Sequence, residues 1–386
     1  MEDPFLLGLS RGTGTVEFSA QAFIEENKLL ECIQCGVCSG SCPVSTKAGL
    51  NIRRMMREVV FTRKLDIPPS ETLWSCTTCS TCQARCPKGL TPFDVIIGMR
   101  GAVIEEGRVE PTIRDALESV FKHGNPWDRI RAKRSEWAEG LDVKPYSEGM
   151  DFLYFVGCTP AYDPRCQEVA RALVTTFSTV NASFGTLGNE ETCCGSCVYG
   201  MGERGLFELL VEDNTELFGG ACFSRMVTTS PHCYHTFKNR YGSQSFEVQH
   251  YTQLLAEFLD SDRINFKERF ERTVAFHDPC FLGRQNKVYD ESRKVLEAVP
   301  GLRLVELDRS RERSLCCEGG GGRMWIDVPG ERLAERRIED AIDSGAEVLA
   351  TCCPFCLSTL EDAVLTSGNE GKMEILDIAE IVSKAL

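Results

Sequence analysis

The chain has 386 residues, of which 42% are hydrophobic and 26% are charged, as in soluble globular proteins of two or three domains. Its net charge of −14 argues against nucleic acid as a partner, because phosphate contacts need a basic face. Twenty-one cysteines in a chain without an export signal argue against a disulfide framework and favour bound metal or redox chemistry.

Two features of the sequence bear on location. The start, Met1-Glu2-Asp3-Pro4, lacks the basic and apolar segments of a secretion signal. The longest apolar run, Phe152 to Val156, has the length of a strand and not of a membrane span. We therefore expect a cytoplasmic protein, in which any membrane association comes through a partner subunit.

The first module contains the same cysteine motif twice. The copies are Cys32-x2-Cys35-x2-Cys38-x3-Cys42-Pro43 and Cys76-x2-Cys79-x2-Cys82-x3-Cys86-Pro87. This is the spacing of two-cluster bacterial ferredoxins, in which the fourth cysteine of each run ligates the other cluster. The expected ligand sets are Cys32, Cys35, Cys38 and Cys86 for one [4Fe-4S] cubane, and Cys76, Cys79, Cys82 and Cys42 for the other. Zinc knuckles are the alternative, but zinc gives no reason for the Cys-Pro endings.

Apolar periodicity predicts helices around these motifs, at Gln21 to Leu30, Asn51 to Val60 and Phe93 to Glu106. The first domain, residues 1–121, is therefore expected to be a mainly helical dicluster domain. Residues 122–149 contain two prolines, three glycines and mixed charges, which are typical of a linker.

The rest of the chain repeats itself. Cysteines 158, 193, 194 and 233 recur at 280, 316, 317 and 356, with offsets of 122 or 123. Strand-like runs precede the first and last cysteine groups of each copy, at Phe152–Val156, Met226–Thr229, Thr273–Phe276 and Glu347–Ala350. Helical stretches lie between them, at Pro164–Thr176, Glu203–Leu217 and Glu331–Ser344. This alternation predicts two duplicated α/β (Rossmann-like) domains, 150–262 and 263–386, with a pseudo-two-fold relation.

The C-terminal copy carries the fuller cysteine set. Its members are Cys280, Cys316, Cys317, Cys353 and Cys356, in three segments spaced thirty-five residues apart. Five thiolates exceed the four ligands of a structural zinc site, so an iron–sulfur centre is expected. Gly319 and Gly320 follow the vicinal pair and would let the backbone approach a cluster. A phosphate-binding loop is disfavoured, because no Lys-Ser/Thr follows the glycines.

The first copy departs from this pattern. Ser230 stands where the equivalent of Cys353 is expected, and Cys197 is an extra thiol. Two accounts are open: a further cluster, or a degenerate copy kept as scaffold. The candidate ligands of that further cluster are Cys158, Cys193, Cys194, Cys197 and Cys233.

Some cysteines and histidines have less definite roles. Cys166, Cys222 and Cys352 have no partner in the repeat and are expected to be buried apolar residues. His277, His232 and His235 lie within a few residues of candidate ligands. Each either supplies a proton to a departing thiolate or is a packed, hydrogen-bonded neighbour of the site.

These motifs resemble the cysteine-rich CCG domains of heterodisulfide reductase. A dicluster ferredoxin followed by two such domains resembles the fused D subunit of that enzyme, and similar chains serve quinone-linked flavoprotein oxidoreductases and glycolate or lactate oxidation systems. The resemblance implies that Cys280, Cys316, Cys317, Cys353 and Cys356 hold a noncubane [4Fe-4S] cluster that cleaves a disulfide. It also implies that the cubanes deliver electrons singly. His277 is then the candidate proton donor.

Two functions follow from the resemblance. One is an enzyme subunit that reduces, or in reverse forms, a disulfide. The other is a non-catalytic conduit between a flavoprotein (an electron-transfer flavoprotein or a 2-hydroxy-acid oxidase) and a membrane quinone partner. Either requires other redox subunits, such as a flavoprotein or a membrane cytochrome or quinone subunit, because the chain has no flavin or quinone signature. Glu318, in place of the usual glycine, and Ser230 are the departures from the family pattern.

Overall fold

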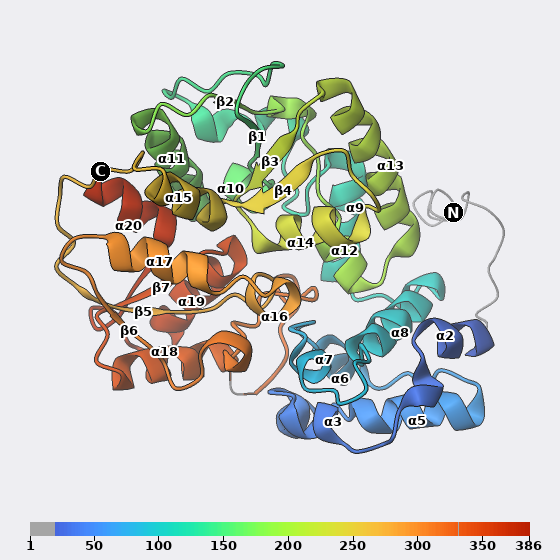
Figure 1. The fold of residues 1–386 in the computed structure, drawn as a ribbon. Helices are drawn as coiled ribbons and strands as arrows, with labels where there is room; N and C mark the ends of the chain where they lie inside the picture. Colours follow the sequence, from blue (N-terminus) through green and yellow to red (C-terminus); the bar gives the residue numbers. More distant parts are fainter. Residues whose placement is uncertain (1–19, 331) are drawn as a thin grey trace. The chain divides into compact units, whose positions relative to one another are not determined.

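The chain forms two compact units in the computed structural model, which describes residues 20–330 and 332–386 (Figure 1). The helical unit comprises residues 20–118, Gly195–Leu209 and 319–330. The two-sheet unit comprises Ser119–Cys194, Leu210–Glu318 and Arg332–Leu386. The start of the predicted first domain and Glu331, the predicted first residue of a helix, lie outside the described residues.

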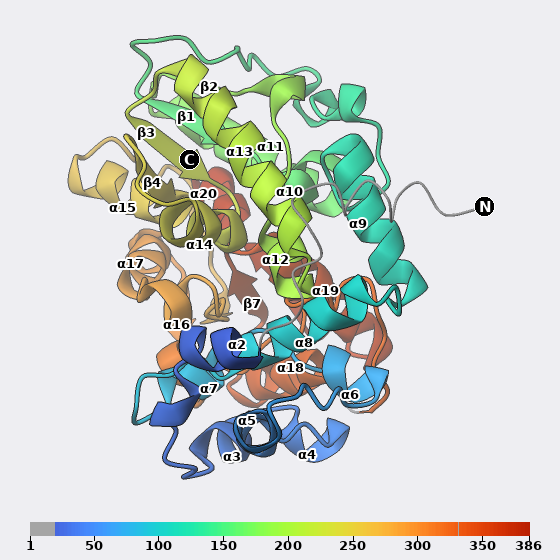
Figure 2. The same ribbon diagram turned by 90° about the vertical axis from the view of Figure 1, so that its right-hand side faces the viewer.

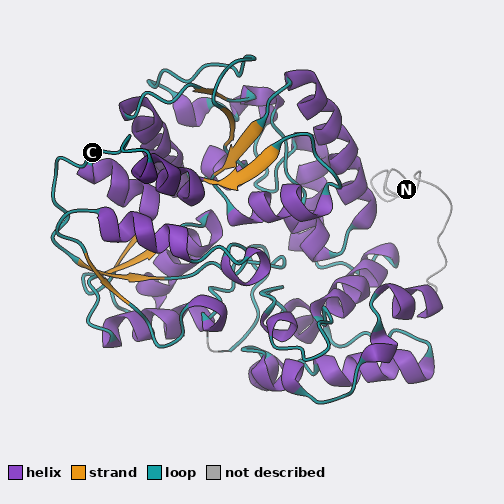
Figure 3. Cartoon of the chain, viewed as in Figure 1, coloured by secondary structure: helices purple, strands orange, loops and turns teal. Residues whose placement is uncertain are grey.

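The described residues of the helical unit contain helices and loops but no strand (Figure 3). Its elements are α2 (Ala20–Glu26), η1 (Leu29–Glu31), α3 (Val37–Ser41), α4 (Ser45–Ala48), α5 (Ile52–Thr62), α6 (Ser70–Trp74), α7 (Thr81–Ala84), α8 (Phe93–Glu105) and α12 (Ser196–Met201). Helices α9 (Pro111–His123) and α13 (Arg204–Ala221) begin in this unit and end in the other. The predicted helices at 51–60 and 93–106 are confirmed. The one predicted at 21–30 breaks in two, because Lys28 adopts a left-handed backbone conformation with φ 50°.

Helix α8 is the centre of this unit, packing against α5, α6 and α12 (Figure 2). Its residues are apolar on nearly every face, as expected of a helix surrounded by protein. The loop after α12 approaches it closely, because a Cβ on Gly202 would lie 2.6 Å from the backbone nitrogen of Gly101. Helix α5 is instead amphipathic and buries Ile52, Met56 and Val59 on one side.

The two-sheet unit contains two parallel sheets with the same strand order. The first sheet has the order β2-β1-β3-β4 and consists of β1 (Phe152–Phe155), β2 (Phe184–Gly185), β3 (Arg225–Thr228) and β4 (Glu247–His250). The second has the order β6-β5-β7-β8 and consists of β5 (Thr273–Phe276), β6 (Arg303–Val305), β7 (Val348–Thr351) and β8 (Glu374–Asp377). The four predicted strands are β1, β3, β5 and β7, confirmed to within one residue at each end.

The helices of this unit cover the sheets. They are η2 (Arg131–Lys133), η3 (Glu136–Ala138), α10 (Cys158–Tyr162), α11 (Pro164–Thr179), η4 (Gly188–Glu190), α14 (Pro231–Arg240), α15 (Tyr251–Asp260), α16 (Gly283–Asn286), α17 (Asp290–Ala298), η5 (Arg311–Arg313), α18 (Leu333–Asp343), α19 (Pro354–Thr366) and α20 (Ile378–Ala385). Helix α11 packs against α20, and α15 packs against α17. Since α11 corresponds to α17 and α15 to α20 in the repeat, these reciprocal contacts are those of a pseudo-two-fold pair.

The predicted linker 122–149 belongs to the two-sheet unit. Trp137 is buried in its core, with its ring edge-on to Tyr154 at 6.2 Å between centroids. The compact units also differ from the predicted domains in that the segments after both vicinal cysteine pairs belong to the helical unit. None of the helices in the described ranges is long and apolar enough to span a membrane.

Candidate functional site

Two cavities in the helical unit are each lined by four cysteines. One is lined by Cys32, Cys35, Cys38 and Cys86, and the other by Cys42, Cys76, Cys79 and Cys82. Each set therefore joins three thiols of one motif to the last thiol of the other. The structure brings together the same four side chains that the ferredoxin spacing assigns to each cubane.

The two cysteine sets differ in solvent exposure. In both, the close packing of the thiols is consistent with a bound metal cluster. Cys35 is exposed, whereas Cys76, Cys79 and Cys82 are buried. Burial and the neighbouring thiols raise the pKa of Cys42 to about 12 and that of Cys82 well above its usual value. Thiolates packed in this way require a compensating cation, which an iron–sulfur core supplies.

Arg100, in the middle of α8, joins this region to the two segments that follow the vicinal cysteine pairs. Its Nη1 donates to the carbonyls of Gly200 at 2.7 Å and Gly321 at 2.8 Å, and its Nη2 to those of Leu73 at 3.0 Å and Cys76 at 2.7 Å. The guanidinium is fully buried and lies over the Trp74 ring. Sequence reasoning missed Arg100, although a single arginine in the middle of a mainly apolar helix is a recognisable signal.

The glycines after the second vicinal pair approach the Cys76 loop within the helical unit. A Cβ on Gly321 would lie 2.7 Å from the Cys76 carbonyl oxygen, and Gly321 has φ 62°. Gly321 thus allows a close backbone approach to the Cys76 loop, whereas the role of Gly319 and Gly320 beside a cluster stays a prediction. Glu318, just before them, has φ 75°, a conformation that favours the glycine usual at this position.

Four members of the C-terminal cysteine set, Cys316, Cys317, Cys353 and Cys356, interact with one another near the carboxyl end of β7, and Cys280 follows the neighbouring strand β5. Ligands bind at this edge in parallel sheets. Cys280 lies in the loop after β5, and Cys353 caps α19 directly after β7. The sulfurs of Cys317 and Cys356 are 3.2 Å apart, and the amide of Glu318 donates to the Cys316 sulfur at 3.4 Å. All five thiols are buried.

His277 lies against this set, with a ring nitrogen within 4.8 Å of the Cys317 and Cys356 sulfurs. Its Nδ1 accepts a hydrogen bond from Arg337 Nε at 3.2 Å, which leaves the ring proton on Nε2. Burial and the neighbouring Arg337 lower the pKa of His277 well below its usual value. The ring is therefore neutral, and Arg337 holds it beside the thiols.

The first repeat contributes a second histidine to this C-terminal set. His232 stacks on Phe281 at 3.9 Å between ring centroids and hydrogen-bonds the Cys353 sulfur. Burial raises the pKa of Cys353, but hydrogen bonds from Cys356 and His232 outweigh it and hold that pKa well below the usual value. His235 instead contacts Asn239 and Asn286, and burial lowers its pKa to about 3. In the sequence His232 is adjacent to Cys233 of the first repeat and far from Cys353.

In the first repeat, four of the five candidate thiols come together. The free thiol of Cys158 forms a hydrogen bond with that of Cys193, and the thiol of Cys194 forms hydrogen bonds with those of Cys193 and Cys233. A buried arginine, Arg134, donates to the Cys158 sulfur at 3.6 and 3.7 Å. The same guanidinium pairs with the equally buried Glu191 at 2.6 Å. The fifth candidate, Cys197, lies in α12 of the helical unit.

Ser230 and Cys353 occupy equivalent structural positions. Each is the cap residue of a helix whose next residue is proline, α14 for Ser230 and α19 for Cys353. The Ser230 hydroxyl accepts a hydrogen bond from the His232 amide at 3.3 Å and so serves as a helix cap. Of the three cysteines without a repeat partner, Cys166 and Cys352 are buried as expected. Cys222 is exposed, which corrects the prediction, because it lies in the turn after α13.

Comparison with known families matches these regions. Residues 152–238 and 274–361 match the CCG family, described as a cysteine-rich domain, and residues 28–90 match a 4Fe-4S dicluster domain. Both descriptions agree with the grouping of thiols described above.

Curated relatives extend the likeness. The chain is 34% identical over 334 residues to the probable iron-sulfur-binding oxidoreductase FadF of Bacillus subtilis, covering 83% of this chain and 47% of that protein. It is 32% identical over 339 residues to the EtfAB:quinone oxidoreductase of Syntrophomonas wolfei, again covering 83% of this chain and 47% of the relative. The chain thus spans about half the length of these two relatives.

A third relative matches from end to end. It is the D subunit of the dihydromethanophenazine:CoB--CoM heterodisulfide reductase of Methanosarcina mazei, 29% identical over 412 residues, covering 98% of this chain and 99% of the relative. The chain thus consists of a 4Fe-4S dicluster region followed by two cysteine-rich CCG domains, and it is similar over nearly its whole length to the D subunit of heterodisulfide reductase.

Proposed function

We propose that the chain is an iron–sulfur oxidoreductase subunit that reduces a disulfide. Electrons would pass through two [4Fe-4S] cubanes in the helical unit to a noncubane [4Fe-4S] cluster held by Cys280, Cys316, Cys317, Cys353 and Cys356. When bound, that cluster supplies one-electron chemistry at sulfur, so that two electrons and two protons convert a disulfide into two thiols. The observation that carries the proposal is the five-thiol set at the carboxyl edge of the second sheet.

The surroundings of the five thiols support this assignment. The His277 ring proton on Nε2 and the hydrogen bond from His232 to Cys353 stabilise sulfur ligands in the thiolate form. His232 belongs to the first repeat and His277 to the second, so both copies of the duplicated domain contribute side chains to this site. The predicted role of His277 as the source of a proton for a departing thiol would require that its neutral ring first take up a proton, because its pKa lies well below the usual value.

The second candidate function, electron transfer without catalysis, is supported by the named relatives and not by the geometry of the site. The oxidoreductases of Bacillus and Syntrophomonas are more similar to this chain than the methanogen protein, and the second is named for quinone reduction. A non-catalytic conduit between a flavoprotein and a membrane quinone partner uses the same clusters. Both functions require other redox subunits.

The EPR spectrum of the oxidised, anaerobically purified protein separates these functions. Thiols such as coenzyme M, coenzyme B and a small-protein thiol would be added one at a time. A disulfide-reducing site gives a new signal with one of them, and the Cys353→Ser variant loses that signal. If no thiol changes the spectrum of protein whose clusters are fully loaded, the conduit function is the correct one.

A further inference from the structure

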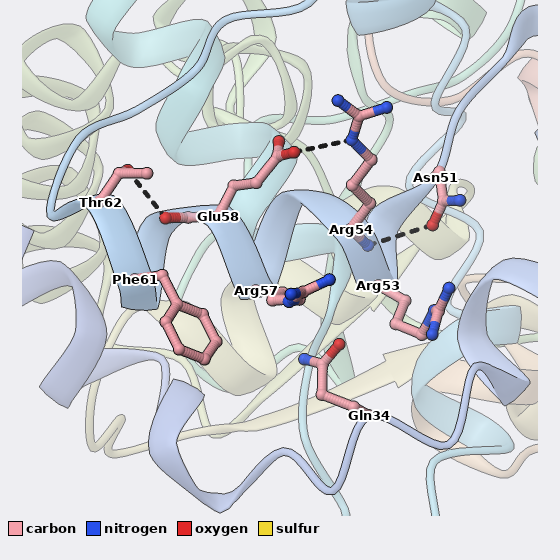
Figure 4. Close-up of a pocket in the computed structure, with 8 residues that line it drawn as sticks. All are labelled: Gln34, Asn51, Arg53, Arg54, Arg57, Glu58, Phe61 and Thr62. Atoms are coloured by element: carbon pink, nitrogen blue, oxygen red, sulfur yellow. Dashed lines mark hydrogen bonds and ion pairs between the residues drawn. The ribbon is translucent and has the colours of Figure 1, made fainter.

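The surface around the more exposed cysteine set is basic and apolar, although the chain as a whole carries a net charge of −14. Arg53, Arg57 and Phe61 follow one another at intervals of four residues along α5, so they lie on one face of that helix. Figure 4 shows this face turned toward Gln34. The Arg57 guanidinium lies 5.5 Å from the centre of the Phe61 ring. These side chains line a cavity of about 420 Å³.

This cavity adjoins the first cysteine set. Arg53 lines both the cavity and the neighbouring one that contains Cys32, Cys35, Cys38 and Cys86. Gln34, also in the cavity wall, donates from Nε2 to the Cys32 sulfur at 3.3 Å. A partner seated here would therefore lie next to the thiols that are most exposed, which is where an electron enters with the shortest path.

Exposed apolar side chains are frequent in this part of the helical unit. Among the described residues eight large apolar side chains are exposed, and four of them are Leu30, Ile33, Val37 and Phe61. Apolar groups gathered beside a cavity with arginines are typical of protein–protein interfaces, in which arginine and aromatic residues are enriched. Within the described part of the chain, neither Arg53 nor Arg57 forms an ion pair that would neutralise it.

We propose that this surface, formed by Leu30, Ile33, Val37, Arg53, Arg57 and Phe61, docks an acidic electron-carrying protein that reduces the cubane of Cys32, Cys35, Cys38 and Cys86. The proposal rests on the proposed function, because it assumes that this set holds a cluster. The partner presents carboxylates to the arginines around its own redox group. Each encounter moves one electron, so the carrier is oxidised as the cubane is reduced. A lipid surface could meet the same charges but would bring no electron.

Stopped-flow reduction of the full protein tests the surface. The probe is reduced flavodoxin, a small acidic flavoprotein, and dithionite serves as a small reductant in parallel. We expect Arg57→Glu to slow reduction by flavodoxin about tenfold at low salt and to flatten its salt dependence. The matched control, Arg108→Glu, changes an exposed arginine elsewhere in the helical unit and should keep the wild-type rate. Phe61→Ser and the exposed Phe121→Ser form a second pair, of which only the first should slow the reaction.

The outcomes separate this proposal from the proposed function. Absence of bleaching by dithionite in the wild-type protein would mean that the clusters are absent, so the proposed function fails. A second outcome is that dithionite reduces the clusters normally but flavodoxin reduces Arg57→Glu and Arg108→Glu at the same rate. That result would overturn the docking surface and leave the proposed function standing. The docking surface is also overturned if the rate at which flavodoxin reduces the wild-type protein does not change with salt concentration. Arginine-dependent sedimentation with phosphatidylserine vesicles, without any effect on the flavodoxin rate, would assign the surface to a membrane instead.

Discussion

At the scale of single residues, the two repeats differ most clearly at one helix cap. Ser230 and Cys353 share the same place after a central strand and before an N-terminal proline, but only the cysteine offers a thiolate. The alignment of the repeats in sequence had already paired them. The equivalence of their backbone positions gives Ser230 a role of its own, as the cap of α14.

Replacing the thiol at this position should remove one cluster. We expect Cys353→Ser to lower the iron content from about 12 to about 8 atoms per chain, because a serine hydroxyl is a poor ligand for iron. The neighbouring Cys352→Ala is the matched control, since Cys352 is fully buried and its sulfur contacts Ser292. Iron analysis and visible spectra of both variants check this. Equal iron in Cys353→Ser and wild type would remove Cys353 from the ligand set.

The serine at the equivalent position should matter for stability and not for iron. Ser230→Ala loses the cap and should destabilise the fold by about 1 kcal/mol, measured as a lower melting temperature. Its iron content should equal that of the wild type. Substitution of the exposed Ser224 by alanine is the control for both readouts. A loss of iron in Ser230→Ala alone would show that the hydroxyl binds a cluster.

At the scale of elements, helix α8 organises the helical unit through one charged side chain. Arg100 satisfies four backbone carbonyls, and two of these belong to the segments that follow the vicinal cysteine pairs. Burial lowers the pKa of Arg100 to about 10, so the guanidinium stays protonated at neutral pH. A buried positive charge of this kind fixes the loops that surround Cys76.

Removing the guanidinium should loosen those segments. In Arg100→Met, four buried carbonyls lose their donor, which should cost at least about 3 kcal/mol. Hydrogen exchange should then rise in Gly195–Leu209 and in 319–330, with a lower melting temperature. Arg108→Met, at an exposed site outside α8, should leave both unchanged. Unaltered exchange in the two segments of Arg100→Met would contradict the role given to this residue.

At the scale of the whole molecule, local patterns predicted the elements but not their grouping. The central strands β1, β3, β5 and β7 are largely buried and rich in apolar residues, and they were predicted closely. The edge strands β2 and β6 have only two and three residues, and β4 and β8 mix apolar with charged or polar residues, so no apolar run in the sequence indicated them. The two compact units could not be predicted from local patterns, because contacts such as those of Arg100 join residues 100 and 221 positions apart.

In the candidate sites too, local patterns predicted some features and missed those that depend on packing. Motif spacing predicted the two four-cysteine sets of the helical unit, because the ferredoxin spacing pairs three thiols of one motif with the last thiol of the other. The hydrogen bond from His232 to Cys353 depends on the packing of one repeat against the other, which no local pattern encodes. For the same reason Cys197, only three residues from Cys194, is grouped with the other unit.

The metal content of the anaerobically purified chain tests the iron–sulfur assignment most directly. Two cubanes and the five-thiol cluster give about 12 irons per chain, and a loaded first repeat would bring the value to about 16. We expect at least about 12, with a matching amount of acid-labile sulfide. About 8 irons would leave the C-terminal thiols without a cluster, and zinc in place of iron would contradict the assignment at every site.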